Sequence, residues 1–232
     1  MTTCVSAYYP VKNKHGDKYL EWFQNTLSIH CPYVIFTTQY QIPLLQSFRK
    51  ELPTHFVECD FTEFETYQYK DVMQVHPVHC PSIQLNLIWN EKVFFMQRAS
   101  IMNPFCSEWF IWVDAGICVY RDTPPPCRPF PDPAKMRRLP QDKFIYSSSQ
   151  PYRPNDVSPT RYYHHVSGGV FVMHQQMMDD FVSLYKEFLD ACKMNSNCIW
   201  TEQVVLTHIF KDNPEMFHRL VDGYGAIITK LH

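Results

Sequence analysis

Residues 109–116 read Trp109-Phe110-Ile111-Trp112-Val113-Asp114-Ala115-Gly116, and this stretch decides the fold class. An uninterrupted apolar run followed by a turn predicts a strand buried on both faces, as in a parallel sheet covered by helices. The carboxylate of Asp114 follows the run directly, and Gly116 lets a backbone approach a ligand closely. Ligands of open α/β sheets bind beyond the carboxyl ends of the strands. Asp114 is therefore a candidate ligand-binding residue, and capping of the next turn is the alternative.

The rest of the chain alternates between strand-like and helix-like patterns. Further strands are predicted at 3–9, 31–38, 55–59 and 165–173, and helices after Asp17 and at 42–52, 82–102, 175–194 and 202–210. Asp17 is a candidate N-cap of the first of these helices. This alternation predicts one α/β domain over residues 1–232, with a mostly parallel central sheet flanked by helices. Residues 121–160 hold more than half of the 18 prolines and are predicted to be an irregular insertion, with an edge strand at 144–147. The tail, 219–231, is predicted to end in a glycine turn and a short strand.

Composition excludes several classes of function. With 21 Lys+Arg against 23 Asp+Glu the net charge is -2, so no bulk attraction to nucleic acid is expected. Small basic clusters, such as Lys12, Lys14 and Lys18, are interpreted as solvated surface. The nine cysteines are odd in number and form no C-x-x-C pair, which favours reduced thiols over disulfides or a zinc site. No apolar run is long enough for a membrane span and no secretory signal is evident, so a cytoplasmic location is expected.

Three other motifs carry possible chemistry. Gly168 and Gly169 interrupt an apolar strand, which indicates either a sugar lying against bare backbone or a packing corner. Glu202 opens a helix after Thr201, where it either orients or deprotonates an acceptor hydroxyl or serves as a capping charge. Lys92 lies among apolar residues of the 82–102 helix, from which it reaches a diphosphate or runs its stem along the helix.

The tyrosine and histidine candidates are less specific. Tyr8, at the end of the first strand, is expected either to stack on a nucleotide base or to pack at the rim of the core. His164, His165, His218 and His232 are candidate nitrogen ligands of a metal, with a hydrogen-bonded structural role as the alternative.

Taken in order, these motifs resemble a known family. The stretches CPYVIFTT (31–38), LIWNEKVFFMQRASIMNPFCSEWFIWVDAG (87–116), SGGVFV (167–172) and TEQVVL (201–206) resemble the HtrL/YibB-like family, whose members are regarded as glycosyltransferases. The variety resembled is that of large DNA viruses and some eukaryotes, and the resemblance spans roughly residues 3–217. The same order is similar to that of GT-A glycosyltransferases in general.

The resemblance implies a GT-A-like fold, a UDP- or GDP-sugar donor, a glycan or protein acceptor, and Mn²⁺ or Mg²⁺. Asp114 then takes the first position of the D-x-D motif as metal ligand and catalytic residue, while Gly116 stands where the second Asp is expected. A His, waters or phosphates would complete such a metal site. Glu202 matches the late acidic catalytic position. The donor-binding positions implied are Tyr8, Lys92, Asp114, Gly116, Gly168 and Gly169.

Three alternatives stay open at this point. A non-catalytic nucleotide-sugar-binding module fits the missing second Asp. A sugar nucleotidyltransferase shares the α/β layout and the metal, but the segment after Tyr9 has one glycine where such enzymes carry a glycine-rich phosphate loop. The third alternative is a hydrolase that uses Cys and His. This chain shows no cysteine at a strand-to-helix elbow, where a helix N-terminus would lower the pKa of the thiol.

Overall fold

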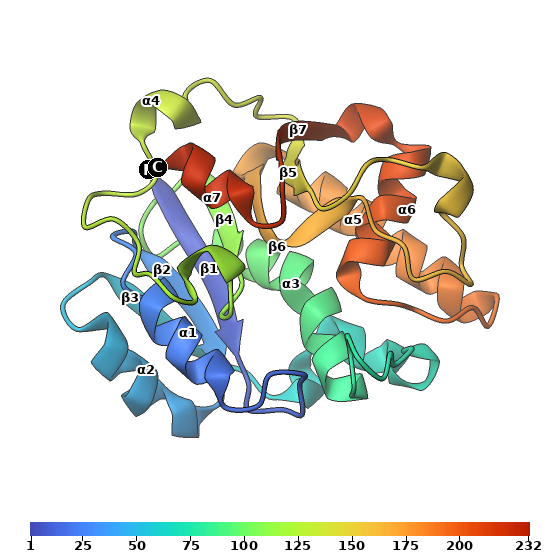
Figure 1. Cartoon of the computed structure of the whole chain (residues 1–232), viewed down its shortest axis with the longest axis horizontal. Coiled ribbons are helices and arrows are strands. Elements are labelled where there is room, and N and C mark those ends of the chain that lie inside the picture. Colours follow the sequence, from blue (N-terminus) through green and yellow to red (C-terminus); the bar gives the residue numbers. More distant parts are fainter.

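One sheet of seven strands runs through the computed structural model, which describes all 232 residues (Figure 1). The spatial order is β3-β2-β1-β4-β6-β5-β7. Strands β3, β2, β1 and β4 are parallel to one another. Strand β6 is antiparallel to β4 and β5, and β7 is parallel to β5. The mostly parallel sheet predicted from the sequence is confirmed. The strands are β1 Thr2–Tyr8, β2 Tyr33–Thr37, β3 Thr54–Glu58, β4 Trp109–Val113, β5 Phe144–Ser148, β6 Val166–His174 and β7 Phe217–Asp222.

Helices cover both faces of the sheet, and strand β4 shows the division. Phe110 and Trp112 point into a cluster of 34 buried residues that includes side chains of α3, α5 and α6. Ile111 and Val113 point into a cluster of 22 that includes side chains of α1, α2 and α7. The helices are α1 Lys18–Thr26, α2 Ile42–Arg49, α3 Ile83–Met102, α4 Pro133–Met136, α5 Gln175–Met194, α6 Glu202–Asp212 and α7 Ala226–Leu231. Short 3₁₀ helices lie at Gln39–Gln41, Phe61–Glu63, Glu65–Val72, Cys118–Tyr120, Pro154–Asp156 and Pro214–Met216.

Helix α3 begins and ends where its sequence predicts. The Ser82 hydroxyl accepts a hydrogen bond from the Leu85 amide at 3.2 Å, so Ser82 is the N-cap. Asn103 adopts a left-handed conformation at the C-cap, with φ of 35°, ahead of Pro104. The helix is buried on nearly every side, including its polar residues. It therefore contacts loops as well as the sheet.

Three of those polar residues anchor segments around the site. The Asn86 and Asn90 amides donate to the carbonyls of Ile199 and Trp200 at 3.0 Å each, directly before α6. The Glu91 carboxylate accepts from Thr66 Oγ1 at 2.8 Å and from the Thr66 amide at 2.9 Å. Burial raises the pKa of Glu91 to about 7, although the bonds from Thr66 oppose the shift.

Three local predictions were wrong. Strand β5 is not an edge strand, because the tail supplies β7 as its outer neighbour. The tail itself runs in the opposite order, with β7 first and helix α7 after the glycine turn, so that Ile227 and Ile228 are buried. The Asp17 side chain makes no capping hydrogen bond at the start of α1. Residues 121–160 are largely irregular apart from α4 and β5, as expected.

Candidate functional site

The candidate residues meet where strand β4 ends, at the carboxyl ends of the parallel strands. Asp114 follows β4 and its amide donates to the Gly169 carbonyl of β6 at 2.9 Å. Glu202 is the first residue of α6, which packs against β6. Lys92 comes from the middle of α3. The fold thus brings together three side chains from positions far apart in the sequence.

The ammonium of Lys92 ties the two carboxylates together. Lys92 Nζ lies 2.7 Å from Asp114 Oδ1 and 2.6 Å from Glu202 Oε1. It also donates to the Gly168 carbonyl at 3.1 Å. An ammonium has three protons, and the protein supplies an acceptor for each of them. The sequence-based hypothesis that Lys92 contacts a diphosphate therefore gives way to a different role, the fixed cation between Asp114 and Glu202.

Burial sets the electrostatics of this group. The side chains of Lys92 and Glu202 are 2% exposed and that of Asp114 is 22% exposed. Burial alone lowers the pKa of Lys92, but the charges of Asp114 and Glu202 outweigh it and raise the pKa, so Lys92 stays protonated. Burial raises the pKa of Glu202, with the charge of Lys92 opposing that shift.

One oxygen of each carboxylate remains for other contacts. Asp114 Oδ1 accepts from the Trp112 indole N–H at 2.7 Å in addition to Lys92. Glu202 Oε2 is buried and has no hydrogen-bond partner. A buried acceptor without a partner costs free energy, so Oε2 is available to a donor group that enters the site.

The glycines serve internal packing rather than a bare ligand-binding backbone. A Cβ on Gly168 would lie 2.1 Å from Glu202 Oε1, and one on Gly116 would lie 2.3 Å from the Tyr19 ring. A Cβ on Gly169 would lie 3.3 Å from Ile117 and Tyr224. The packing alternative therefore accounts for Gly168. Close packing also explains Gly116, which was expected to admit a ligand and which still lines the cleft.

Two adjoining cavities form a cleft over this edge of the sheet. The first, about 490 Å³, lies at the end of β1 and is lined by Tyr8, whose ring also stacks on Phe23 at 5.7 Å. The second, about 300 Å³, is lined by Glu202. Both cavities share Tyr19, Trp89, Lys92, Asp114 and Gly116. Asp114 therefore stands at the boundary between the two cavities, and Glu202 faces the second one.

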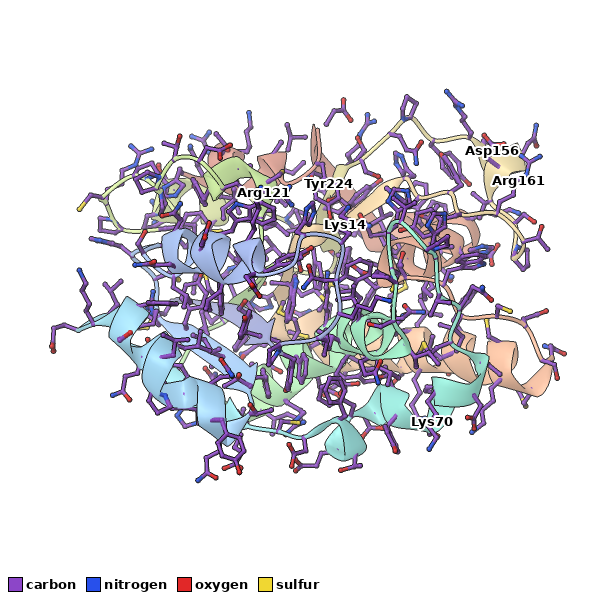
Figure 2. The ribbon with its side chains drawn as sticks, turned by 60° about the horizontal axis from the view of Figure 1, so that its bottom comes forward. Lys14, Lys70, Arg121, Asp156, Arg161 and Tyr224 are labelled. Atoms are coloured by element: carbon purple, nitrogen blue, oxygen red, sulfur yellow. The ribbon has the colours of Figure 1, made fainter.

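The second cavity contains residues that the sequence did not single out. Figure 2 labels Lys14, Arg121 and Tyr224, which line it from three separate segments. His79 and Tyr162 also line it and stack with their rings 5.2 Å apart. Lys14, interpreted from the sequence as solvated surface, belongs to this lining. These residues lie in irregular segments, whose spatial neighbours no periodicity reveals.

Of the four candidate histidines, the cavity lining contains His164. Burial, and then the charge of His79, lowers the pKa of His164 to about 4, and its Nδ1 lies 2.7 Å from Ser149 Oγ. His165 is buried against the Tyr146 hydroxyl at 3.0 Å, and His232 packs against the Phe130 ring. His165 and His232 are thus structural.

The residues of the cleft do not fit a resident divalent cation. Nowhere do three or more His, Cys, Asp or Glu side chains gather, so the protein alone supplies no complete set of metal ligands. A cation on Asp114 Oδ1 would also meet the Lys92 ammonium, which lies 2.7 Å from the same oxygen. Two neighbouring cations repel each other strongly where water is scarce.

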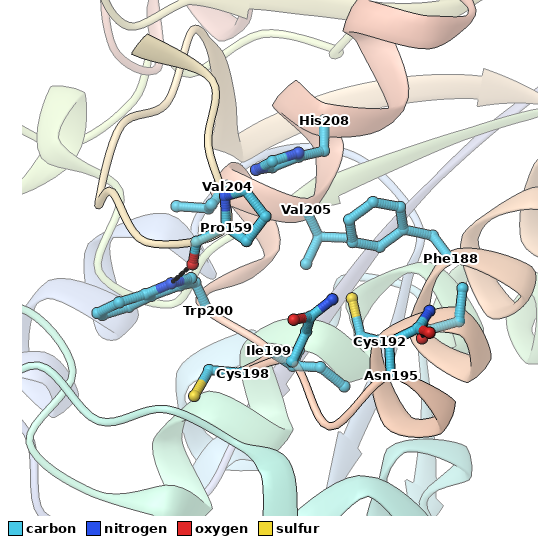
Figure 3. Close-up of a pocket in the computed structure, with 12 residues that line it drawn as sticks. Pro159, Phe188, Cys192, Asn195, Cys198, Ile199, Trp200, Val204, Val205 and His208 are labelled. Atoms are coloured by element: carbon cyan, nitrogen blue, oxygen red, sulfur yellow. Dashed lines mark hydrogen bonds between the residues drawn. The ribbon is translucent and has the colours of Figure 1, made fainter.

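A further cavity lies apart from the cleft and has a different chemistry. It measures about 160 Å³, lies between α5 and α6, and shares no residue with the cleft (Figure 3). Its lining is mainly apolar, with Cys192 and His208 among it and no Asp, Glu, Lys or Arg. The Trp200 indole N–H donates to the Pro159 carbonyl at 2.9 Å beside it. This cavity therefore offers no Asp, Glu, Lys or Arg side chain to a ligand.

Comparison of the fold identifies its class. The structure is similar to that of mouse xyloside xylosyltransferase 1 in its apo form, with a TM-score of 0.54, 12% identity, and coverage of 94% of this chain and 84% of that chain. The glycosyltransferase GlyE of Streptococcus pneumoniae TIGR4 gives a TM-score of 0.46 at 11% identity, covering 94% of this chain and 44% of that one. The chain has the GT-A glycosyltransferase fold.

The sequence then assigns the family. Residues 57–226 match the HtrL_YibB family, described as bacterial protein of unknown function, and the chain belongs to this family. No curated protein matches the sequence. None of the helices combines the length and the apolar character that crossing a membrane requires.

Proposed function

We propose that this chain transfers a glycosyl group from a UDP- or GDP-sugar to a hydroxyl of a glycan or protein acceptor. The observation that carries the proposal is a pair of carboxylates beyond the carboxyl ends of β1 and β4. Asp114 lies at the boundary of two adjoining cavities, and Glu202 lines the second cavity. A GT-A fold binds its ligand in that place, as open α/β sheets do in general.

Each cavity suits one part of the donor. The cavity of about 490 Å³ at the end of β1 offers the Tyr8 ring and a largely apolar wall to the nucleoside. The cavity of about 300 Å³ offers polar groups to the sugar and the acceptor. Glu202 Oε2, buried without a partner, accepts a hydrogen bond from a sugar hydroxyl. Asp114, held by Lys92 and Trp112, orients the reacting sugar.

The reaction balances in the usual way for glycosyl transfer. The bond from the anomeric carbon to the phosphate oxygen breaks, and its electron pair leaves with the nucleoside diphosphate. The acceptor oxygen forms the new bond to that carbon. Its proton passes to Glu202 in an inverting reaction, or to the departing phosphate in a retaining one. The anomeric configuration of the product, read by NMR, distinguishes the two.

A donor screen tests the proposal. Purified protein is incubated with a panel of UDP- and GDP-sugars, with and without Mn²⁺, and nucleoside diphosphate release is measured. We expect slow hydrolysis of one donor, reduced at least 100-fold in Asp114→Asn and Glu202→Gln, and unchanged in Asp180→Asn, an exposed carboxylate on α5. Binding of a donor without any release would make the chain a binding module, and release of pyrophosphate would make it a nucleotidyltransferase. Either result would refute the proposal.

A further inference from the structure

The second cavity carries an excess of positive charge. Its charged lining residues are three cations, Lys14, Lys92 and Arg121, against two carboxylates, Asp114 and Glu202. Lys92 pairs with both carboxylates, and the five ionised groups together carry one net positive charge. Neither Lys14 nor Arg121 takes part in any ion pair of the chain. Lys14 and Arg121 therefore face the cavity without an ion-pair partner.

Arg121 is held in place with its terminal amino groups free. Its Nε donates to the Gly116 carbonyl at 3.0 Å, in the turn that follows Asp114. Its guanidinium lies over the Trp22 ring, 4.1 Å from the centroid. Neither Nη1 nor Nη2 donates to a protein acceptor. A fixed guanidinium with two open amino groups matches the oxygens of a phosphate in a bidentate arrangement.

Lys14 approaches the same space from the turn before α1. The Asn13 side chain organises that turn, accepting from the His15 amide at 2.8 Å and donating to the Val11 carbonyl at 3.0 Å. Burial, and then the charge of Arg121, lowers the pKa of Lys14. Lys14 and Arg121 thus lie close enough to repel each other, and an anion between them would relieve that repulsion.

We propose that Lys14 and Arg121 bind the diphosphate of the nucleotide and neutralise the charge of the leaving group without a divalent metal at Asp114. That this diphosphate is the leaving group of a sugar donor rests on the proposed function. Lys92 cannot take this part, because its three protons go to Asp114, Glu202 and Gly168. The protein's own cations thus occupy both positions, with Lys92 between the carboxylates and Lys14 and Arg121 beside the phosphates.

Calorimetric titration of the whole chain with inorganic diphosphate, UDP and GDP in excess EDTA tests the proposal. We expect binding that weakens as salt rises, because exposed charges are screened. Arg121→Met and Lys14→Met should each weaken it at least tenfold, about the loss of one charge-assisted contact. Lys70→Met and Arg161→Met are matched controls, exposed cations away from the cleft (Figure 2), and should bind as wild type does. Thermal unfolding of each variant confirms that it is folded.

Several results would overturn the inference. They are binding that requires Mn²⁺ and disappears in Asp114→Asn, absence of binding in EDTA, and wild-type binding in both cleft variants. The proposed function fails in a different way. If diphosphate binds as expected but no nucleotide sugar is turned over, the anion site stands and glycosyl transfer does not. If turnover occurs only with Mn²⁺, glycosyl transfer stands and this inference falls.

Discussion

Replacing Lys92 by Met tests whether its ammonium stabilises the site. The change removes the cation that lies 2.7 Å from Asp114 Oδ1 and 2.6 Å from Glu202 Oε1, and leaves two carboxylates close together. Glu202 would be a buried charge without a counter-charge, since its side chain is 2% exposed. We therefore expect a large loss of stability.

The magnitude follows from the burial of the two partners. Removing one partner of a buried ion pair costs about 3–5 kcal/mol. Asp114 softens the loss, because it is 22% exposed and keeps its bond from Trp112. We expect the free energy of unfolding to fall by about 4 kcal/mol, within that range. For a chain of this length the melting temperature should drop by roughly 8–16 °C.

The loss of stability in Lys92→Met should depend on pH in a definite direction. Burial raises the pKa of Glu202 above its ordinary value of 4.5, and without Lys92 only a backbone hydrogen bond opposes that shift. The folded variant then binds the proton more tightly than the unfolded chain does. Its stability is highest below the ordinary pKa of a glutamate and is lost as pH rises through the raised pKa. The deficit of Lys92→Met should therefore shrink as pH falls from 7.5 to 5.

Urea and thermal unfolding of four proteins measure this effect. The double variant Lys92→Met/Glu202→Gln should recover at least about 1 kcal/mol over the single variant, because it removes the unpaired charge. Lys186→Met is the control, since its pair with Asp190 at 3.5 Å is solvent-exposed and contributes at most about 1 kcal/mol. A Lys92→Met protein within 1 kcal/mol of wild type, or a double variant less stable than the single one, would refute the reasoning.

Three other predictions concern packing and buried polar groups. Gly168→Ala should lower the free energy of unfolding by about 1–3 kcal/mol, because its Cβ would lie 2.1 Å from Glu202 Oε1. Gly169→Ala should lower it less, because the nearest atom to its Cβ would lie at 3.3 Å. Urea unfolding compares the two variants. Burial raises the pKa of Glu91 from 4.5 to about 7, so Glu91 stabilises the fold at low pH. That stabilisation, on the order of 3 kcal/mol, is lost as pH rises through this range. Glu91→Gln should flatten the profile of stability against pH, and an unchanged profile would contradict the assignment. Arg49 donates to four backbone carbonyls, so even Arg49→Lys, which lacks the planar fork, should lower stability by about 3 kcal/mol, and a wild-type melting temperature would count against this reading.

The sheet and its long helices could be predicted because each is encoded locally. The run Trp109–Val113 is apolar on both faces, and Ser82 and Asn103 mark the ends of α3. The tail was predicted wrongly because its strand is only partly buried and its burial does not alternate. Its pairing with β5 depends on a partner far away in sequence.

The candidate site was predicted only in part. Asp114, Lys92 and Glu202 were each found from a local pattern, but their mutual contact joins residues 110 positions apart, which no local pattern encodes. The role expected for Lys92 changed for that reason, since its acceptors lie in other segments. Arg121 was missed because it follows a 3₁₀ turn in a proline-rich region, and only the fold brings it to the carbonyl of Gly116.

Most residues of helix α3 are buried, so few of its positions are free to vary. Asn90, Glu91 and Lys92 are consecutive, yet they bind the segment before α6, the 3₁₀ helix at Glu65–Val72 and the carboxylates of the cleft. A one-residue slip or a kink in this helix would release all three regions together. Amide hydrogens at residues 65–66, 168 and 202–204 should therefore exchange as one cooperative unit rather than as separate loops. In a lineage of related sequences, substitutions in this turn of the helix would have to arise as coordinated sets.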